Sequence, residues 1–429
     1  MARTVPPIPS DPGLPRGRGL FGEEGRDAVR SFLSERGWAA REIRPVQAIY
    51  RPGRSLIVRY RAAVEGPVGR RSLSVCAETR VRERRAASVP RGFEERYGIA
   101  DPVDRRDGTL LWAYPYDPSL AGLPDAAWGP WVRDASGTAK PAALSVQPLR
   151  YRPRRRAVFR YRALHLGRRG RRWETYFGKV LPGDKAERLV GSAPALEAAR
   201  RAVPLALPAA RAGRDVLLFP PLAGRSLRDV LIHGGSLPSP ARVAGLPAAL
   251  DAAVTRAGAE ISAERPASID LAGPGADLIA GLVPEAGDDA RRVVNAVREG
   301  TEHDDVAPSI VHGDLYEAQV FVGWGFTLGL IDLDDLGRGD PALDAANFCA
   351  HLLALALVVP SAADRLVAYR RLVRPAFAEV LGLSPRALAW REALCMLLLA
   401  AGPFRVLHPS WPDAVRRRAA LAVRLLEDH

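Results

Sequence analysis

The chain has 429 residues, 47% of them hydrophobic and 26% charged, which excludes a disordered or fibrous protein. Its formal net charge is +14, and only three of its 62 basic residues are lysines. Three scattered cysteines are too few for a disulfide framework, so we expect a cytoplasmic setting. The most apolar stretch, residues 345–360, is too short to span a membrane, and the chain's start lacks the apolar run of a secretory signal.

The first half of the chain contains an internal repeat. Residues 50–62 (YRPGRSLIVRYRA) and 151–163 (YRPRRRAVFRYRA) agree at eight of thirteen positions, with an offset of 101 residues. In both copies apolar and polar residues alternate, a Gly-Arg turn follows, and a second strand-like segment leads to a helical one. Each copy is therefore predicted to form an antiparallel sheet with one packed helix. The copies differ at one position of interest, where Lys179 of the second replaces Glu78 of the first.

From residue 225 onward the chain is predicted to be mainly helical. Apolar residues at three- and four-residue spacing predict helices over residues 240–258, 288–300, 342–359, 362–381, 385–401 and 413–428. Two segments of period two, residues 318–322 and 326–331, flank a Gly-Trp-Gly turn and predict a hairpin. The expected class is α+β, with an antiparallel-sheet part before a helical part.

Carboxylates gather at the ends of this hairpin. Its entry, SIVHGDLYEAQVFV, contains Asp314 and Gln319, and its exit, LGLIDLDDLGRGDPALD, places Asp332 directly after the return strand. The hairpin should bring these three side chains to one end. Carboxylate and amide oxygens suit Mg²⁺, which completes its shell with water and substrate phosphates. Phosphoryl transfer uses such a metal, together with a carboxylate near the attacking hydroxyl and a lysine on the phosphates.

The segments HGDLYEAQ, IDLDD and GRGDPALD resemble the aminoglycoside phosphotransferase and choline kinase-like family over about residues 144–425. The resemblance implies a bilobal protein-kinase-like fold, with an antiparallel-sheet N-lobe and a mainly helical C-lobe. The first repeat copy would be a degenerate N-lobe-like duplicate, similar to the extra N-terminal module of maltokinase-like members. The implied organisation is a flexible tail at 1–30, a cap module at 31–135, a nucleotide-binding N-lobe at 143–224 and a C-lobe at 225–429.

The resemblance also implies roles for single residues. Asp314 matches the catalytic base, and the metal ligands are Gln319, Asp332 and Asp334; His312, Asp340 and Asp344 brace the loop and cap the next helix. The nucleotide-binding residues are Lys179, its helix partner Glu197 (favoured over Glu187), and the hinge residues Phe219, Pro220, Pro221 and Leu222. Gln319 stands where the family has Asn. The turn RPRRRA lacks the glycines of a phosphate-covering loop, so arginine side chains are the alternative phosphate ligands.

The expected reaction moves the γ-phosphoryl group of ATP, or of GTP, to a hydroxyl of a small molecule, with Mg²⁺ as cofactor and a sugar as the favoured acceptor. The predicted acceptor region is Trp390, Phe404, Arg405 and Trp411, with a structural loop between helices as the rival interpretation. Two alternatives stay open: a kinase acting on Ser or Thr of a biosynthetic peptide, and a pseudokinase that serves as a scaffold for a partner protein. Neither a membrane nor nucleic acid is expected as a partner, because no stacking platform or recognition motif interleaves the arginines.

Overall fold

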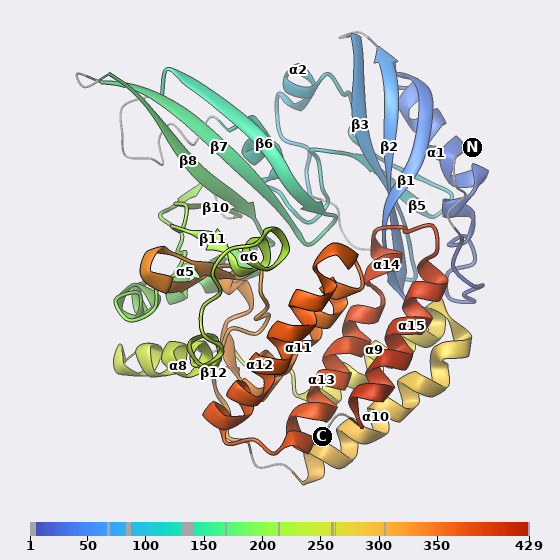
Figure 1. Cartoon of the computed structure of the whole chain (residues 1–429). Coiled ribbons are helices and arrows are strands. Elements are labelled where there is room, and N and C mark those ends of the chain that lie inside the picture. Colours follow the sequence, from blue (N-terminus) through green and yellow to red (C-terminus); the bar gives the residue numbers. More distant parts are fainter. Residues whose placement is uncertain are drawn as a thin grey trace. The chain divides into compact units, whose positions relative to one another are not determined.

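The computed structural model describes residues 6–66, 69–82, 87–129, 141–167, 170–212, 215–258, 261, 263–303 and 306–427. The chain divides into two compact units. Unit 1 comprises residues 1–187, 208–221 and 403–412, and unit 2 comprises residues 188–207, 222–402 and 413–429. Unit 1 carries two antiparallel sheets and unit 2 is mainly helical (Figure 1), which agrees with the predicted α+β class.

The first sheet of unit 1 has five strands in the order β1-β2-β3-β5-β4. They are β1 (Ala39–Arg51), β2 (Ser55–Gly66), β3 (Gly69–Arg80), β4 (Val103–Arg106) and β5 (Thr109–Ala113). Every second side chain of β2 from Leu56 to Val64 is buried, as expected of a strand with one face on a core. The helix α1 (Glu23–Ser34) packs against β1 and β3. Short helices η1 (Gly19–Phe21), α2 (Phe93–Tyr97) and α3 (Leu123–Trp128) lie in the connections.

The second sheet has the same strand order, β6-β7-β8-β10-β9, and is drawn in green in Figure 1. Its strands are β6 (Ala143–Arg152), β7 (Arg156–Gly167), β8 (Gly170–Val180), β9 (Ala210–Ala212) and β10 (Val216–Phe219), and α5 (Gly183–Ala199) follows β8. The strand register also repeats. Glu78 pairs with Ile57 in the first sheet, and Lys179 pairs with Val158 in the second, each 101 residues later.

The repeat unit is longer than its sequence pattern indicates. In the first copy the Asp11 carboxylate accepts the Tyr50 hydroxyl and the Gly53 N–H, both at 2.8 Å. In the second copy the Asp117 carboxylate accepts the Tyr151 hydroxyl at 2.7 Å and the Arg154 N–H at 2.8 Å. Both aspartates open an Asp-Pro-x-Leu segment. Each repeat unit therefore begins at this aspartate, which holds the first hairpin turn of its own sheet.

This finding corrects the predicted flexible tail over residues 1–30. Residues 1–5 lie outside the described part, but Ile8 and Leu14 are 1% and 2% exposed, and α1 begins at Glu23. Residues 6–34 thus belong to the first copy. The predicted end of the cap module, residue 135, lies outside the described residues.

Unit 2 is a group of packed helices with two small sheets. Its helices are α6 (Leu227–His233), α7 (Pro240–Ala244), α8 (Leu246–Arg256), α9 (Ser268–Leu282), α10 (Gly287–Glu302), α11 (Pro341–Ala356), α12 (Ala363–Leu381), α13 (Pro385–Ala400) and most of α15 (Trp411–Leu425). The helix α11 packs against α12 and α13, and α10 packs against α9 and α13. The strands β11 (Arg225–Ser226), β13 (Val320–Val322) and β14 (Leu328–Leu330) form one sheet, and β12 (Ser309–Val311) pairs with β15 (Gly337–Gly339).

Capping residues fix where several of these helices begin. Ser384 and Asp340 are the N-caps of α13 and α11; their side chains accept hydrogen bonds from the N–H groups of Ala387 and Ala342, and a proline follows each cap.

The predicted helix over residues 240–258 is two helices, because the chain breaks at Gly245. The helix α9 was not predicted at all.

One helical segment, Pro385–Arg405, is long and apolar enough to span a membrane by length and composition. Some 78% of its apolar window is buried inside the protein, so the core accounts for its apolar side chains. By the same test the bent pair Pro341–Ala356 and Pro360–Leu381 passes only as a broken span.

Candidate functional site

The loop after β12 carries Asp314 and is held by a buried carboxylate of α11. Asp344, in the first turn of α11, accepts the backbone N–H of His312 at 2.7 Å and that of Gly313 at 3.0 Å. Its carboxylate is 3% exposed, and burial raises its pKa. The two N–H groups would otherwise be left without acceptors, so Asp344 fixes the backbone on which Asp314 stands.

A glycine is required immediately before Asp314. Gly313 has φ +79°, and a Cβ added there would lie 2.2 Å from the carbonyl oxygen of Asp335. Any other residue would therefore strain the backbone and push apart two neighbouring loops. The loop that carries Asp314 and the loop of residues 333–335 thus approach each other closely.

Two hydrogen bonds join the loop of Asp314 to the end of β14. The His312 Nε2 donates to the Ile331 carbonyl at 2.9 Å, and the Gln319 Nε2 donates to the Asp332 carboxylate at 3.0 Å. Both donor residues are buried, with 1% and 3% exposure. Because a carbonyl only accepts, the proton of the neutral His312 ring lies on Nε2. The structure therefore brings Gln319 and Asp332 together, and the His312 ring ties the loop of Asp314 to the end of β14.

The oxygen atoms at the end of β14 fit a metal that is shared with a substrate. Asp332 has φ +65°, an unfavourable conformation for a residue with a side chain and one typical of functional sites. Rotation of the Gln319 amide would present an oxygen beside this carboxylate, and Asp334 follows two residues later. Among the described residues no group of three or more His, Cys, Asp or Glu side chains is arranged to hold a metal. This donor set suits Mg²⁺ completed by water and phosphates, and does not form a closed protein cage.

Three further residues position this site, and none of them was predicted. Asn347 of α11 donates to the Leu315 carbonyl at 3.0 Å, and its amide lies 3.5 Å from the Asp314 carboxylate. Arg265 pairs with Asp335 at 3.3 Å, and Arg391 pairs with Asp340, the N-cap of α11, at 2.6 Å. These side chains come from distant segments with no fixed spacing to the HGD motif, so the sequence offered no signal for them.

The residues between Asp314 and Gln319 form a second buried polar group. The Glu317 carboxylate has 0% exposure and accepts from Arg228 at 2.7 and 2.8 Å, while burial raises its pKa. The Tyr316 ring stacks on the His351 ring with centroids 4.2 Å apart, and Arg228 lies over the Tyr316 ring. Burial lowers the pKa of His351 to about 3, so this imidazole is neutral at pH 7. The group fastens the HGD segment to α6 and α11.

The predicted nucleotide-binding residues of unit 1 lie on its second sheet. Lys179 is 8% exposed on β8, where it pairs with Val158 and Leu217 of the neighbouring strands. Phe219 ends β10, and the division between the two units falls between Pro221 and Leu222, inside the predicted hinge. Glu197 belongs to unit 2, where its exposed carboxylate pairs with Arg200 at 3.3 Å. Its predicted partnership with Lys179 stays a prediction.

The four predicted acceptor residues have different environments. Phe404 and Trp411 are each 1% exposed and pack against each other in unit 1, where Phe404 also contacts Phe21 and Tyr50 of the first copy. Their burial leaves no surface for an acceptor, which corrects that prediction in favour of its structural rival. Arg405 is half-buried, and desolvation lowers its pKa.

Trp390 differs from the other three because it lines an open cavity of about 670 Å³ within unit 2. The cavity wall also contains polar side chains of Glu299, His303, Ser384 and Arg386. Trp390 is therefore the member of the predicted acceptor region that lines this cavity.

No model of a protein family matches the chain, and no curated protein matches it. Among solved structures the chain is similar to an ethanolamine kinase from Plasmodium vivax, with 10% identity, 65% of this chain and 82% of that chain covered, and a TM-score of 0.41. It is also similar to an aminoglycoside 2'-phosphotransferase-IIIa in a GDP complex (15% identity, 66% and 94% covered, TM-score 0.42). A choline/ethanolamine kinase family protein from Mesorhizobium loti gives 16% identity, 66% and 88% covered, and a TM-score of 0.43. Its function is inferred below from its own residues.

Proposed function

We propose that the chain is a metal-dependent phosphotransferase that moves the γ-phosphoryl group of ATP, or of GTP, to a hydroxyl of a small molecule. The observation that carries the proposal is the contact of Gln319 with Asp332, 3.0 Å apart, beside a loop that Asp344 and His312 hold rigid. An isolated HGD tripeptide would be an ordinary turn. Here two oxygen-bearing side chains meet at the end of one hairpin, next to the loop that presents Asp314.

Asp314 would accept the proton of the attacking hydroxyl. It stands on a loop whose backbone is fixed at both ends, so its carboxylate is positioned before a substrate arrives, and positioning is most of what catalysis of phosphoryl transfer requires. Asn347 lies near the same carboxylate and would limit its rotation.

Asp332, Gln319 and Asp334 would hold Mg²⁺, which when bound neutralises charge on the transferred phosphate. Lys179 would contact the phosphates of the nucleotide, and Phe219, Pro220, Pro221 and Leu222 would face its base. A compact ammonium at residue 179, in a chain with only three lysines among 62 basic residues, supports this role.

A sugar-like alcohol remains the favoured acceptor. Trp390 lines a cavity that also contains hydrogen-bonding residues, a combination that suits a polyol with polar edges and apolar faces. A peptide hydroxyl is the second acceptor class.

The test begins with thermal denaturation of the full chain in the presence of ATP or GTP, each with Mg²⁺ or with EDTA. A shift that requires both nucleotide and Mg²⁺ is expected. ADP release is then measured with sugars, aminoglycosides, choline, ethanolamine and Ser-containing peptides. Binding without transfer to any acceptor would favour the pseudokinase, and the absence of any nucleotide-dependent shift would refute the proposal.

A further inference from the structure

The turn between β6 and β7 has an unusual conformation for its sequence. Arg154, at its tip, has φ +60°, and the residue at the equivalent position of the first copy, Gly53, has φ +61°. Glycine adopts this left-handed region without strain, whereas a side chain makes it unfavourable. The second copy thus keeps a glycine-type turn while carrying an arginine, so other contacts must hold the turn in place.

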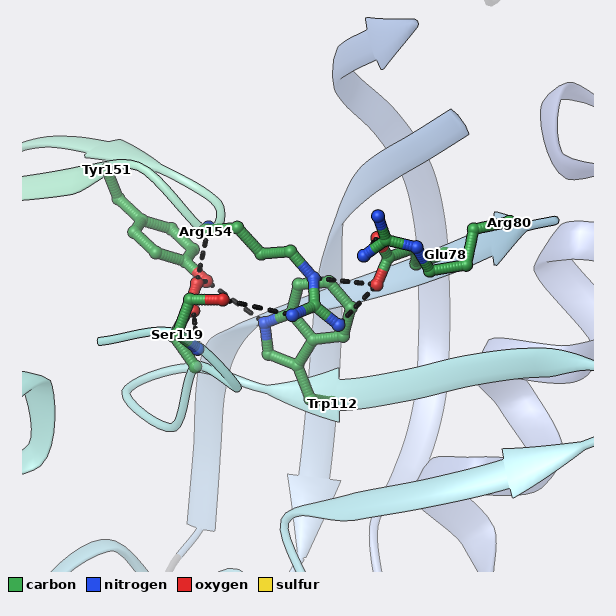
Figure 2. A network of polar contacts seen from close by, with 7 residues as sticks. Glu78, Arg80, Trp112, Ser119, Tyr151 and Arg154 are labelled. Carbon is green, nitrogen blue, oxygen red and sulfur yellow. Dashed lines mark hydrogen bonds and ion pairs between the residues drawn. The ribbon is translucent and has the colours of Figure 1, made fainter. Parts of the chain in front are cut away.

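Those contacts come from the first copy and from the beginning of the second repeat unit (Figure 2). The Arg154 Nε donates to the Glu78 carboxylate at 2.7 Å, and its Nη1 donates to the Ser119 hydroxyl at 3.0 Å. The guanidinium also lies over the Trp112 ring, 5.4 Å from its centroid. The Arg154 N–H and the Tyr151 hydroxyl both donate to the buried Asp117 carboxylate.

The ion pair is shielded from water. The side chains of Glu78 and Arg154 are 1% and 8% exposed, and Arg80 provides a second cation at 3.2 Å from Glu78. Buried, hydrogen-bonded ion pairs fix geometry strongly, because loss of one partner leaves a desolvated charge. Trp112 donates to the Tyr151 hydroxyl at 3.0 Å and so adds a second link between the copies.

Glu78 occupies the register position that Lys179 occupies in the second copy. The first copy therefore lacks the lysine, and its glutamate binds the turn of its neighbour instead. The same register position thus carries an anion in the first copy and a cation in the second.

We propose that the first sheet is a brace for the β6–β7 turn, with Glu78 as a positioning residue that acts through Arg154 on nucleotide binding. This inference rests on the proposed function, because the turn corresponds to the loop that would cover the triphosphate.

The arginines on either side of Arg154 support the inference. Arg152 and Arg155 flank the tip, and Arg405 lies close enough to affect Arg152 electrostatically. Burial, and then these neighbouring cations, lower the pKa of Arg152 to about 9. A turn that concentrates positive charge in this way is suited to an anion, provided that its backbone is fixed before the anion binds.

The test compares Glu78→Gln, Arg154→Gly and the double variant with the wild-type chain. Arg154→Gly copies the first repeat, so it relieves the backbone while removing the link to Glu78. The matched control is Glu65→Gln on β2, since this exposed glutamate pairs with Arg41 and Arg70 at the far end of the same sheet. We would measure the dissociation constant of Mg-ATP, and KM for ATP and kcat in the presence of the best acceptor. Hydrogen exchange at the amides of residues 154–156 would report on the turn.

Each single variant should weaken Mg-ATP binding by about tenfold or more and raise KM for ATP more than it lowers kcat. The turn amides should exchange at least about tenfold faster, and the double variant should be no weaker than the worse single one, because both act through one link. The control should match the wild type. If Glu78→Gln does not fold, the double variant, which removes both charges, answers the same question.

The proposed role of the first sheet is refuted if the variants bind nucleotide with unchanged affinity. It is also refuted if the effects of the two substitutions on that affinity are additive. A wild-type chain that binds no nucleotide would instead refute the proposed function. The two failures are therefore distinguishable.

Discussion

The neutral imidazole of His351 predicts a specific loss of stability in acid. The ordinary pKa of 6.5 applies to the unfolded chain, whereas burial lowers the pKa in the folded chain to about 3. Below pH 6.5 the His351 ring therefore binds a proton in the unfolded chain, whereas in the folded chain it stays neutral until the pH falls to about 3. The free energy of unfolding should fall as the pH decreases from 6.5 and should level out near pH 3.

The size of this effect follows from the difference between the two pKa values. At about 1.4 kcal/mol per pKa unit, the ceiling is about 5 kcal/mol, of which about 3 kcal/mol should be lost by pH 4. His351→Phe keeps a ring to stack on Tyr316 and removes the titrating group. Its loss of stability between pH 7 and pH 4 should be about 3 kcal/mol smaller than that of the wild type.

The assay is urea denaturation of the full chain, followed by far-ultraviolet circular dichroism at pH 7, 6, 5 and 4. The control is His303→Phe, because His303 is the exposed C-cap residue of α10. If the wild type and His351→Phe lose stability in parallel as the pH falls, protonation of His351 costs little free energy, and the reasoning is refuted.

Three further substitutions test the site. Asp314→Asn should lower the transfer rate by about 10²–10⁴-fold with nucleotide affinity and melting temperature kept, since only proton acceptance is lost; retained turnover would contradict its role as base. Lys179→Arg should lower kcat/KM for ATP by about tenfold or more in steady-state assays, because a planar guanidinium cannot replace a compact ammonium; equal kinetics would remove Lys179 from the site. Asp344→Asn should lower the free energy of unfolding by about 2–4 kcal/mol in urea titrations, since it weakens acceptance from two buried N–H groups, and an unchanged midpoint would speak against that account.

The parts of the fold that were predicted are those whose signal is local. The hairpin around residues 320–330 follows from alternation, and the helix after Asp340 follows from apolar residues at three- and four-residue spacing; both are present. The helix α9 was missed because Gly273, Pro274 and Gly275 lie inside it and suggest a turn. A Cβ on Gly275 would lie 2.7 Å from the Leu398 side chain, so this glycine serves the close packing of two helices.

The parts that were not predicted depend on contacts between distant segments. Asp11 and Asp117 are equivalent in the structure, but their offset is 106 residues and that of the strands is 101, so the shared Asp-Pro-x-Leu segment did not align with the rest of the repeat. Phe404 and Trp411 were expected near the acceptor because they lie in the helical half, and only tertiary structure places them in the core of unit 1. Nothing in the spacing of a single sequence encodes such pairings.

The hydrogen bond from the Trp411 indole N–H to the Pro6 carbonyl, at 2.9 Å, joins residues 405 positions apart. A ribosome that adds about 5–20 residues per second needs roughly 20–80 s between those two positions. During synthesis the side chains of Phe21 and Tyr50 therefore lack their contact with Phe404 until the C-terminal part of the chain has been made. Chaperones would meet that uncovered surface on the nascent chain, and shortened versions that end before residue 403 would expose it permanently.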